Sequence, residues 1–69
     1  MVKFNKGGKT IYRRSLHVTE VFEVKNGTAI WYLSGTKVIV SESMDTVMRV
    51  VFNHDEGVLN EVDDKAFVV

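Results

Sequence analysis

Serine and histidine side chains could do chemistry in this chain, but their spacing does not assemble a reactive site. The sequence contains two histidines, His17 and His54, and no cysteine, which excludes disulfides, thiolate zinc sites and cysteine nucleophiles. One histidine falls in an extended segment and the other near the end of a helical segment, so they form no close-spaced metal-binding pair. Ser15 and His17 share one side of an extended segment, but no nucleophile elbow or oxyanion device accompanies them. We therefore expect a protein that is not an enzyme and that uses no metal and no cofactor.

Three short motifs are typical of ligand sites, yet each lacks the surroundings that the chemistry requires. Gly8-Lys9-Thr10 matches the end of a phosphate-binding P-loop, whose first glycine would fall where the chain has Lys3. Asn26-Gly27-Thr28 matches a glycosylation sequon, but the N-terminal residues predict no signal peptide. Asp63-Asp64 lacks the spaced oxygen ligands and the glycine of a calcium loop. We expect the last two to be turns and predict no small-molecule substrate.

Charged residues are segregated along the chain, although its formal net charge is zero. The basic group, which shares residues 1–14 with no acid, consists of Lys3, Lys6, Lys9, Arg13 and Arg14. The acidic group near the C-terminus consists of Asp55, Glu56, Glu61, Asp63 and Asp64. The basic end suits contact with nucleic acid or an acidic protein, and the acidic end suits mimicry of nucleic-acid phosphates. The alternative is that each group is simply a solvated face.

Aromatic residues interleave with the basic group, as in proteins that bind single-stranded nucleic acid. Phe4 and Tyr12 are the residues concerned. Because side chains alternate across a strand, Arg13 and Arg14 are expected on opposite faces, which weakens a single basic patch. The helical segment carries only Arg49 as a base, so we predict no readout of a duplex groove by a helix.

Glycine-containing turns divide the first forty residues into strands. Lys6-Gly7-Gly8-Lys9 predicts a hairpin between strands at residues 2–5 and 10–15. Asn26-Gly27 is the strongest hairpin signal, because a type I′ turn requires positive φ at both central residues. Gly35-Thr36 fits a second two-residue loop of type II′. The segment from residue 18 to residue 40 is therefore predicted to be an antiparallel meander of three strands.

Counting outward from these two loops assigns the two faces of the meander. Phe22 then faces Trp31, and Trp31 faces Val40. The predicted core face consists of Val18, Phe22, Val24, Ala29, Trp31, Leu33, Val38 and Val40. On the opposite face an apolar group with a polar rim is predicted to bind a partner, and it consists of Val21, Ile30, Tyr32 and Ile39.

A helix is predicted after the meander, because apolar residues recur at helical spacing. The apolar stripe consists of Met44, Val47, Met48 and Val51. Ser43 is the expected N-cap and Gly57 the expected C-terminal cap, with Asp45 suited to the first turn. The stripe is expected to pack on the Phe22, Trp31 and Leu33 face, with Trp31 at the centre of the core.

The chain of 69 residues is expected to form one domain with a small core. The predicted fold class is α+β, a small antiparallel meander of about four to five strands with one α-helix on one face. Residues 57–69 form an acidic C-terminal segment. Within it, Phe67-Val68-Val69 is predicted to add an edge strand, to fold back over the apolar group, or to exchange with a second copy. No apolar run approaches the roughly 18 residues of a membrane span, so we expect a soluble cytoplasmic protein with no membrane partner.

Residues 8–51 resemble the FlbD-like family of small flagellar and swarming-motility proteins. The resemblance is carried by the run from Ser15 to Glu23, the hairpin ending Thr28-Ala29-Ile30, and the strand and helix start from Gly35 to Met48. It implies a β-meander, a valine-rich strand ending in Glu-Ser, and a following helix, with no catalytic residue. The strand from Val38 to Ser43 and the following helix are also similar to small phage-encoded type II anti-CRISPR proteins.

The leading hypothesis is a non-enzymatic bacterial or phage protein that binds a protein partner, or itself as a homodimer, through the apolar sheet face. One alternative is a phage-encoded inhibitor of a host defence protein that acts by acidic mimicry of nucleic acid. The other is binding of single-stranded nucleic acid by the basic N-terminal hairpin.

Overall fold

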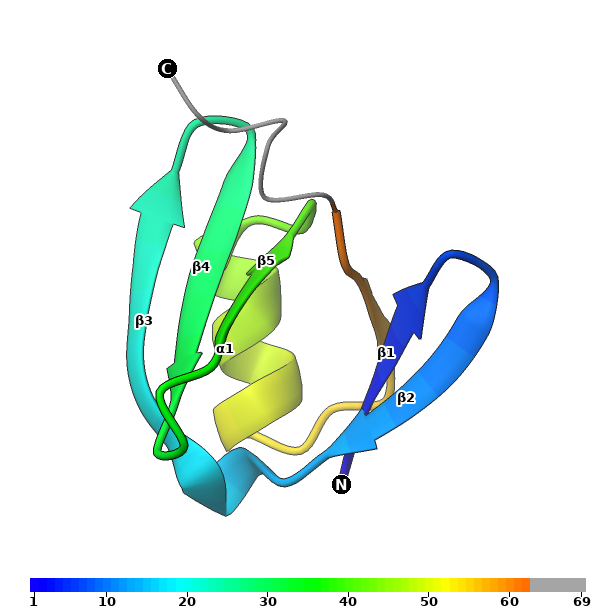
Figure 1. Cartoon of the computed structure of the whole chain (residues 1–69), viewed down its shortest axis with the longest axis horizontal. Coiled ribbons are helices and arrows are strands. Elements are labelled where there is room, and N and C mark those ends of the chain that lie inside the picture. Colours follow the sequence, from blue (N-terminus) through cyan, green and yellow to red (C-terminus); the bar gives the residue numbers. More distant parts are fainter. Residues whose placement is uncertain (63–69) are drawn as a thin grey trace.

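The protein is an α+β fold of two small sheets and one helix, as seen in a computed structural model that describes residues 1–62 (Figure 1). The elements are β1 (Val2–Lys6), β2 (Lys9–Arg13), a 3-10 turn η1 (Ser15–His17), β3 (Val18–Val24), β4 (Gly27–Tyr32), β5 (Lys37–Val40), α1 (Met44–Phe52) and β6 (Val58–Asn60). The first sheet has the strand order β2-β1-β6, and the meander has the order β3-β4-β5. The predicted class, an antiparallel meander with one helix, is confirmed. The structure adds a separate three-stranded sheet to it.

The first sheet contains the predicted hairpin and a parallel strand from the C-terminal segment. Gly7 and Gly8 both have positive φ, 57° and 82°, as the two central residues of a type I′ turn require. β6 pairs in parallel with β1, and Glu61 then forms a bridge to Val40 of β5. The C-terminal segment therefore links the two sheets through residues 58–61. The alternatives predicted for Phe67-Val68-Val69 lie outside the described residues.

The first turn of the meander lies one residue earlier than predicted. Val24 pairs with Gly27, so the loop is Lys25-Asn26, and Asn26 takes the left-handed conformation with φ 66°. Phe22 consequently faces Ala29 rather than Trp31. This displacement is two residues, an even number, so the side chains from Glu20 to Val24 keep the relation to β4 that was predicted for them. An irregularity between Val18 and Glu20 pairs Val18 with Tyr32 and moves Val18 to the opposite face.

The second turn differs by an odd number of residues and exchanges the faces. Trp31 pairs with Lys37, three residues from the predicted partner Val40. The Tyr32 carbonyl accepts the Gly35 N–H at 2.8 Å, and the Tyr32 N–H donates to the Thr36 carbonyl at 2.9 Å. Gly35 has φ 88° at the third position of this loop, as in three-residue hairpin loops that end in a left-handed residue.

The exchange decides which residues form the core. Buried in one cluster are Val2, Phe4, Ile30, Tyr32, Val38, Val40, Val47, Val50, Val51 and Leu59, with Ile11, Val18 and Val21 packed against it. The prediction that Val21, Ile30, Tyr32 and Ile39 form an exposed group is therefore wrong. Ile30 is fully buried, Tyr32 and Ile39 are almost so, and Val21 is half-buried. Val38 pairs with Ile30 and therefore lies on the same face as Ile30. An odd shift of register moves the side chains of one strand to the opposite face relative to its neighbour.

Phe22 and Leu33, which were predicted to be core residues, are exposed instead, and Trp31 is only half-buried. Trp31 and Phe22 point to the side of the meander away from the core, because Ile30 and Tyr32 occupy the inner positions of β4. The predicted central role of Trp31 in the core is therefore wrong.

The helix begins as predicted and ends differently. The Ser43 hydroxyl accepts the Thr46 N–H at 3.4 Å, so the N-cap is confirmed. The helix ends at Phe52 with Asn53 as its C-cap, and His54, not Gly57, takes the left-handed conformation with φ 57°. The predicted cap at Gly57 is therefore wrong. Val47, Val50 and Val51 are the buried helix residues, whereas Met48 is exposed.

Candidate functional site

The β1–β2 hairpin presents an exposed basic surface, which we call the basic hairpin. It consists of Lys3, Lys6, Lys9, Tyr12 and Arg14, all of them exposed. Val2 and Phe4 point into the core, so the alternate residue Lys3 points outward, directly across from Tyr12. Tyr12 is 57% exposed, so its ring is accessible to a ligand.

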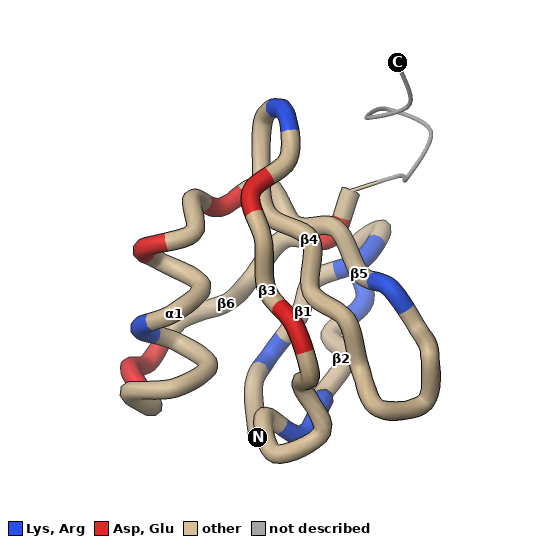
Figure 2. Tube along the Cα trace, turned by 90° about the vertical axis from the view of Figure 1, so that its left-hand side faces the viewer, with Lys and Arg blue, Asp and Glu red and all other residues tan. Residues whose placement is uncertain are grey.

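The charges of the basic hairpin are not compensated locally. Lys6 and Lys9 are direct cross-strand partners beside the Gly7-Gly8 turn. Like charges directly opposite each other destabilise a strand pair. Within residues 1–62, Arg13 and Glu61 form the one ion pair found, and it uses none of the basic hairpin residues. Figure 2 shows the basic positions along β1 and β2 and the acidic positions on β3 and around α1. The surface is therefore electropositive and suited to an anion.

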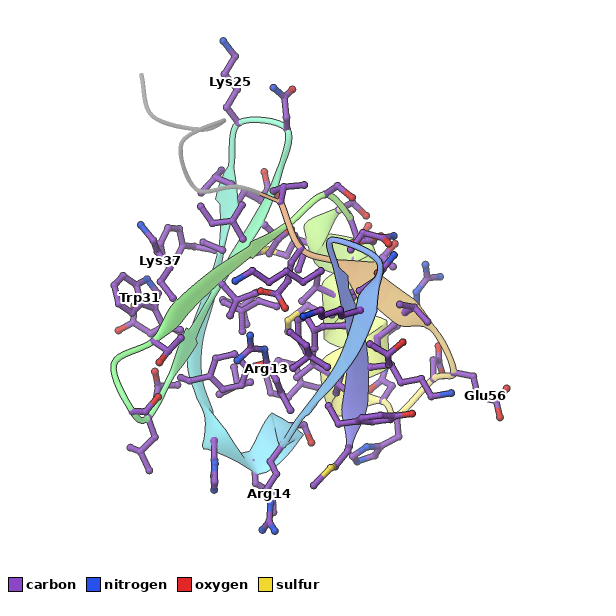
Figure 3. All side chains as sticks on the ribbon, turned by 45° about the vertical axis from the view of Figure 1, so that its right-hand side comes forward. Arg13, Arg14, Lys25, Trp31, Lys37 and Glu56 are labelled. Carbon is purple, nitrogen blue, oxygen red and sulfur yellow. The ribbon has the colours of Figure 1, made fainter. Side chains whose placement is uncertain are left out.

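Arg13 differs from the other predicted basic contact residues because it points inward. Its Nη2 lies 3.3 Å from Oε2 of Glu61, whose side chain is 6% exposed. The guanidinium carbon lies 5.4 Å from the ring centre of Phe4 and 5.6 Å from that of Tyr32. Figure 3 shows Arg13 between the two sheets and Arg14 directed outward, so the predicted opposite orientation is confirmed. Arg13 holds the sheets together and is not exposed for contact with a large partner.

Tyr32 lies beside this ion pair, and its hydroxyl is held in the protonated form. Burial raises the pKa of Tyr32 to about 12, because the phenolate would lose its hydration. The positive charge of Arg13 lowers this pKa, and the negative charge of Glu61 raises it. Tyr32 was predicted to belong to an exposed partner-binding group, but the structure buries its ring in the core.

Among residues 1–62, the structure does not place the predicted acidic contact residues on one exposed surface. Asp55 and Glu56 are exposed in the segment after α1. Glu61 is paired with Arg13 and almost buried, which removes it from a surface that mimics phosphates. Asp63 and Asp64 lie outside the described residues. Of the three named residues that the structure describes, Asp55 and Glu56 stay available for acidic mimicry.

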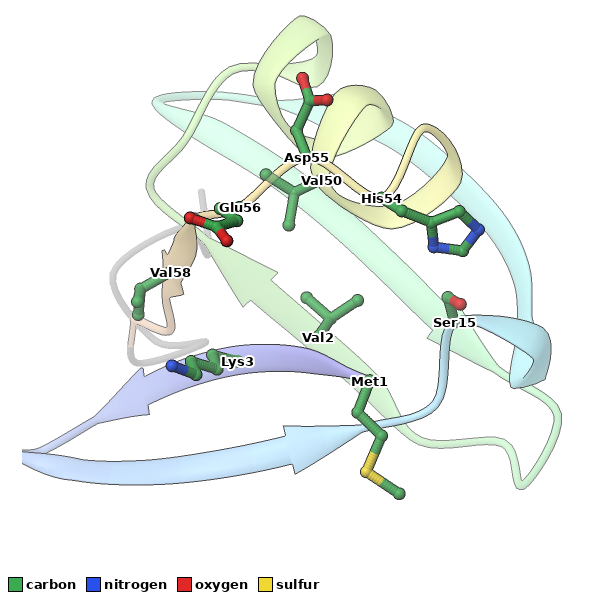
Figure 4. Close-up of a pocket in the computed structure, with 10 residues that line it drawn as sticks. Met1, Val2, Lys3, Ser15, Val50, His54, Asp55, Glu56 and Val58 are labelled. Atoms are coloured by element: carbon green, nitrogen blue, oxygen red, sulfur yellow. The ribbon is translucent and has the colours of Figure 1, made fainter.

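A cavity of about 540 Å³ lies beside Asp55 and Glu56, between the start of β1 and the end of α1 (Figure 4). Ser15 and His54 both line it, although they come from distant segments. No hydrogen bond joins them within residues 1–62, and Figure 4 shows the Asp55 carboxylate directed away from the His54 ring. The cavity thus brings together a hydroxyl, an imidazole and carboxylates without aligning them for proton transfer.

The outer side of the meander carries an apolar surface that the sequence pattern assigned to the core. We call Phe22, Trp31 and Leu33 the outer meander surface. Phe22 is 40% exposed and Leu33 is 74% exposed. The Lys37 ammonium lies 5.7 Å from the ring centre of Trp31. No signal in the alternation identified this surface, because both faces of β4 and β5 are apolar.

Among the described residues no group of histidine and acidic side chains could hold a metal ion, and no helix there is long and apolar enough to cross a membrane. Comparison of the chain with protein-family models, with curated proteins and with solved structures gives no match.

Proposed function

We propose that the protein binds single-stranded nucleic acid through the basic hairpin. The observation that carries the proposal is the uncompensated charge of four exposed basic residues beside an exposed aromatic ring. Lys3 lies directly across from Tyr12, Arg14 follows β2, and Lys6 and Lys9 form a cross-strand pair at the hairpin tip. Proteins that bind single strands without sequence preference combine cations that follow the backbone with aromatic rings on which bases stack. The hairpin supplies both within one rigid pair of strands.

The geometry suits an extended chain of phosphates. From Lys9 to Arg14 the chain advances five residues, roughly 17 Å at the rise of a β-strand. A phosphate near the tip would also relieve the repulsion between Lys6 and Lys9. This role places the protein in a compartment that contains nucleic acid, and we propose the cytoplasm of a bacterial cell.

Salt dependence separates charge contacts from stacking in one experiment. Affinity for a fluorescent oligothymidylate is measured by anisotropy over a range of salt concentrations. For single strands, the slope of log affinity against log salt concentration is about −0.7 for each phosphate neutralised. Four cations therefore predict a slope of about −2.8. The double substitution Lys6→Gln/Lys9→Gln is expected to reduce this to about −1.4.

Tyr12→Ala provides the complementary test. Loss of a stacked base weakens binding by about 1 to 3 kcal/mol, and it leaves the salt slope unchanged because no charge is removed. Lys25→Gln is the matched control, since Lys25 is an exposed base in the turn between β3 and β4. Binding that is absent at low salt, or that falls equally in the Lys25 variant, contradicts the proposal.

A second candidate is self-association through the outer meander surface, which transfers the predicted homodimer contact to the opposite sheet face. β3 is an edge strand of the meander, so one side of its backbone has no strand partner within residues 1–62. A second copy that pairs β3 with β3 would extend the sheet and join the two outer meander surfaces, with Phe22 of each copy, across a two-fold axis. Light scattering over a dilution series tests this, with Phe22→Ser expected to dissociate the dimer. A monomer at every concentration contradicts it.

A further inference from the structure

A small cavity at one end of the molecule is surrounded entirely by hydrogen-bond donors. It has a volume of about 210 Å³ and lies where the end of β2, the η1 turn and the β4–β5 loop meet. Its lining consists of Arg13, Arg14, His17, Tyr32, Ser34 and Thr36. Each of these side chains can donate a hydrogen bond, none is acidic, and none is purely apolar. We call this cavity the donor pocket.

The fold assembles the donor pocket from two segments that are separate in the sequence. The Leu33 N–H donates to the His17 carbonyl at 2.7 Å, which fixes the η1 turn against the β4–β5 loop. The loop itself is closed by the hydrogen bonds between Tyr32 and Gly35 and between Tyr32 and Thr36. The pocket walls are therefore held by backbone hydrogen bonds rather than by side-chain packing alone.

Several donors of the pocket have no acceptor. Both hydrogen bonds from Arg13 to Glu61 use Nη2, and its Nε is buried without a partner among residues 1–62. The Ser34 hydroxyl donates to the Thr36 hydroxyl at 3.0 Å, so the Thr36 hydrogen remains for another acceptor. The Tyr32 hydroxyl stays protonated and can donate. Unsatisfied donors of this kind are stabilised by an acceptor with several oxygens.

The charge and size of the pocket favour a compact anion. Glu61 compensates Arg13 from within the protein, whereas no acid lines the pocket to compensate Arg14. Arg14 lines the pocket, and Figure 3 shows its side chain extending away from the body of the protein. The volume is below the roughly 300 Å³ at which pockets accept drug-sized molecules. Donors line the pocket from the end of β2, the η1 turn and the β4–β5 region, and a phosphate carries enough oxygens to accept charge-assisted hydrogen bonds from several of them.

We propose that the donor pocket binds a single phosphate group, either as inorganic phosphate or as the phosphate monoester at the end of a nucleic-acid strand. The inference does not rest on the proposed nucleic-acid function, because inorganic phosphate alone tests it. The basic hairpin would attract a polyanion along its length, whereas the donor pocket would hold one phosphate in a fixed place.

The first experiment is a titration of the isotope-labelled protein with sodium phosphate, followed by two-dimensional NMR at constant ionic strength against sodium chloride. Saturable shifts of the amides of residues 14–17 and 33–36, absent with chloride, are the expected result. Arg14→Gln is expected to weaken binding about tenfold or more, and Thr36→Val by about two- to tenfold. A well-dispersed spectrum of each variant shows that it is folded.

One control variant makes the result decisive. Lys6→Gln/Lys9→Gln should leave the phosphate affinity unchanged, because those residues lie on the hairpin tip. If this variant loses binding while Arg14→Gln and Thr36→Val retain it, the phosphate lies on the hairpin and the proposal is overturned. The absence of saturable shifts in the pocket also overturns it.

The source of the phosphate is identified with two oligothymidylates that differ only at the 5′ end. Tighter binding of the 5′-phosphorylated strand, abolished in Arg14→Gln, supports the pocket as a site for a strand end. Equal binding of both strands, together with saturable binding of inorganic phosphate, supports the pocket as a site for the free ion.

Discussion

Glu61→Gln is expected to destabilise the protein, because it leaves the guanidinium of Arg13 between the sheets without its countercharge. The two groups lie 3.3 Å apart, and the Glu61 side chain is 6% exposed against 24% for Arg13. Removing one partner of a fully buried pair costs about 3 to 5 kcal/mol. The partial exposure of Arg13 and the oxygen retained by glutamine reduce the cost, and we expect about 2 kcal/mol.

This loss is large for a chain of 69 residues, whose free energy of unfolding is about 3 to 10 kcal/mol at the usual value per residue. Urea unfolding followed by the fluorescence of Trp31, the one tryptophan in the sequence, measures it. Glu56→Gln is the matched control, since Glu56 is exposed and its substitution should change the free energy by less than about 0.5 kcal/mol.

A double-mutant cycle separates the pair from its surroundings. Arg13→Met removes the charge and keeps an apolar stem between Phe4 and Tyr32. The double variant Arg13→Met/Glu61→Gln should be more stable than the sum of the two single losses predicts, with a coupling of about 1 to 2 kcal/mol. A coupling near zero, or a Glu61→Gln variant as stable as the unmodified protein, would refute the assignment of this pair as a link between the sheets.

Three further predictions follow from the core and the register. Because the folded pKa of Tyr32 is raised to about 12, its contribution to stability is fully present below pH 10 and lost as the pH rises from 10 through 12; Tyr32→Phe should abolish this loss in urea unfolding at alkaline pH. Ile30→Ala should cost about 2 to 5 kcal/mol and Phe22→Ala less than about 1.5 kcal/mol, and the reverse order in thermal unfolding would contradict the exchanged faces. Gly27→Ala should separate β4 from β5, because an added Cβ would overlap the Val40 carbonyl oxygen; an unchanged pattern of amide protection would contradict that close approach.

The sequence alone was sufficient for the local elements. The two glycines at positions 7 and 8 predicted the first hairpin, because few other residues accept two consecutive positive φ values. Ser43 predicted the start of the helix through its hydroxyl. Strand alternation placed Arg13 and Arg14 on opposite faces, and the structure shows that Arg13 is the inward one. Each of these signals depends on the chemistry of a few neighbouring residues.

The candidate sites were only partly accessible to the same reasoning. The basic hairpin follows from composition and alternation, so four of its five residues were named as basic contacts and Tyr12 was noted as an accompanying aromatic. The donor pocket was not predicted, because Arg14 and Thr36 become neighbours only when the η1 turn bonds to the β4–β5 loop. Nothing in the spacing of those residues indicates that contact.

Tertiary structure alone decided which face of the meander is the core. In β4 and β5 the apolar residues occupy both faces, so burial of either face satisfies the hydrophobic pattern. The choice depends on the register, and the register depends on whether Gly35 occupies the first or the third position of its loop. The helix and the first sheet cover the face of Ile30 and Tyr32, and this packing leaves Phe22 and Leu33 exposed. A pattern that is apolar on both sides fixes the strands, but the elements packed against them determine which side is buried.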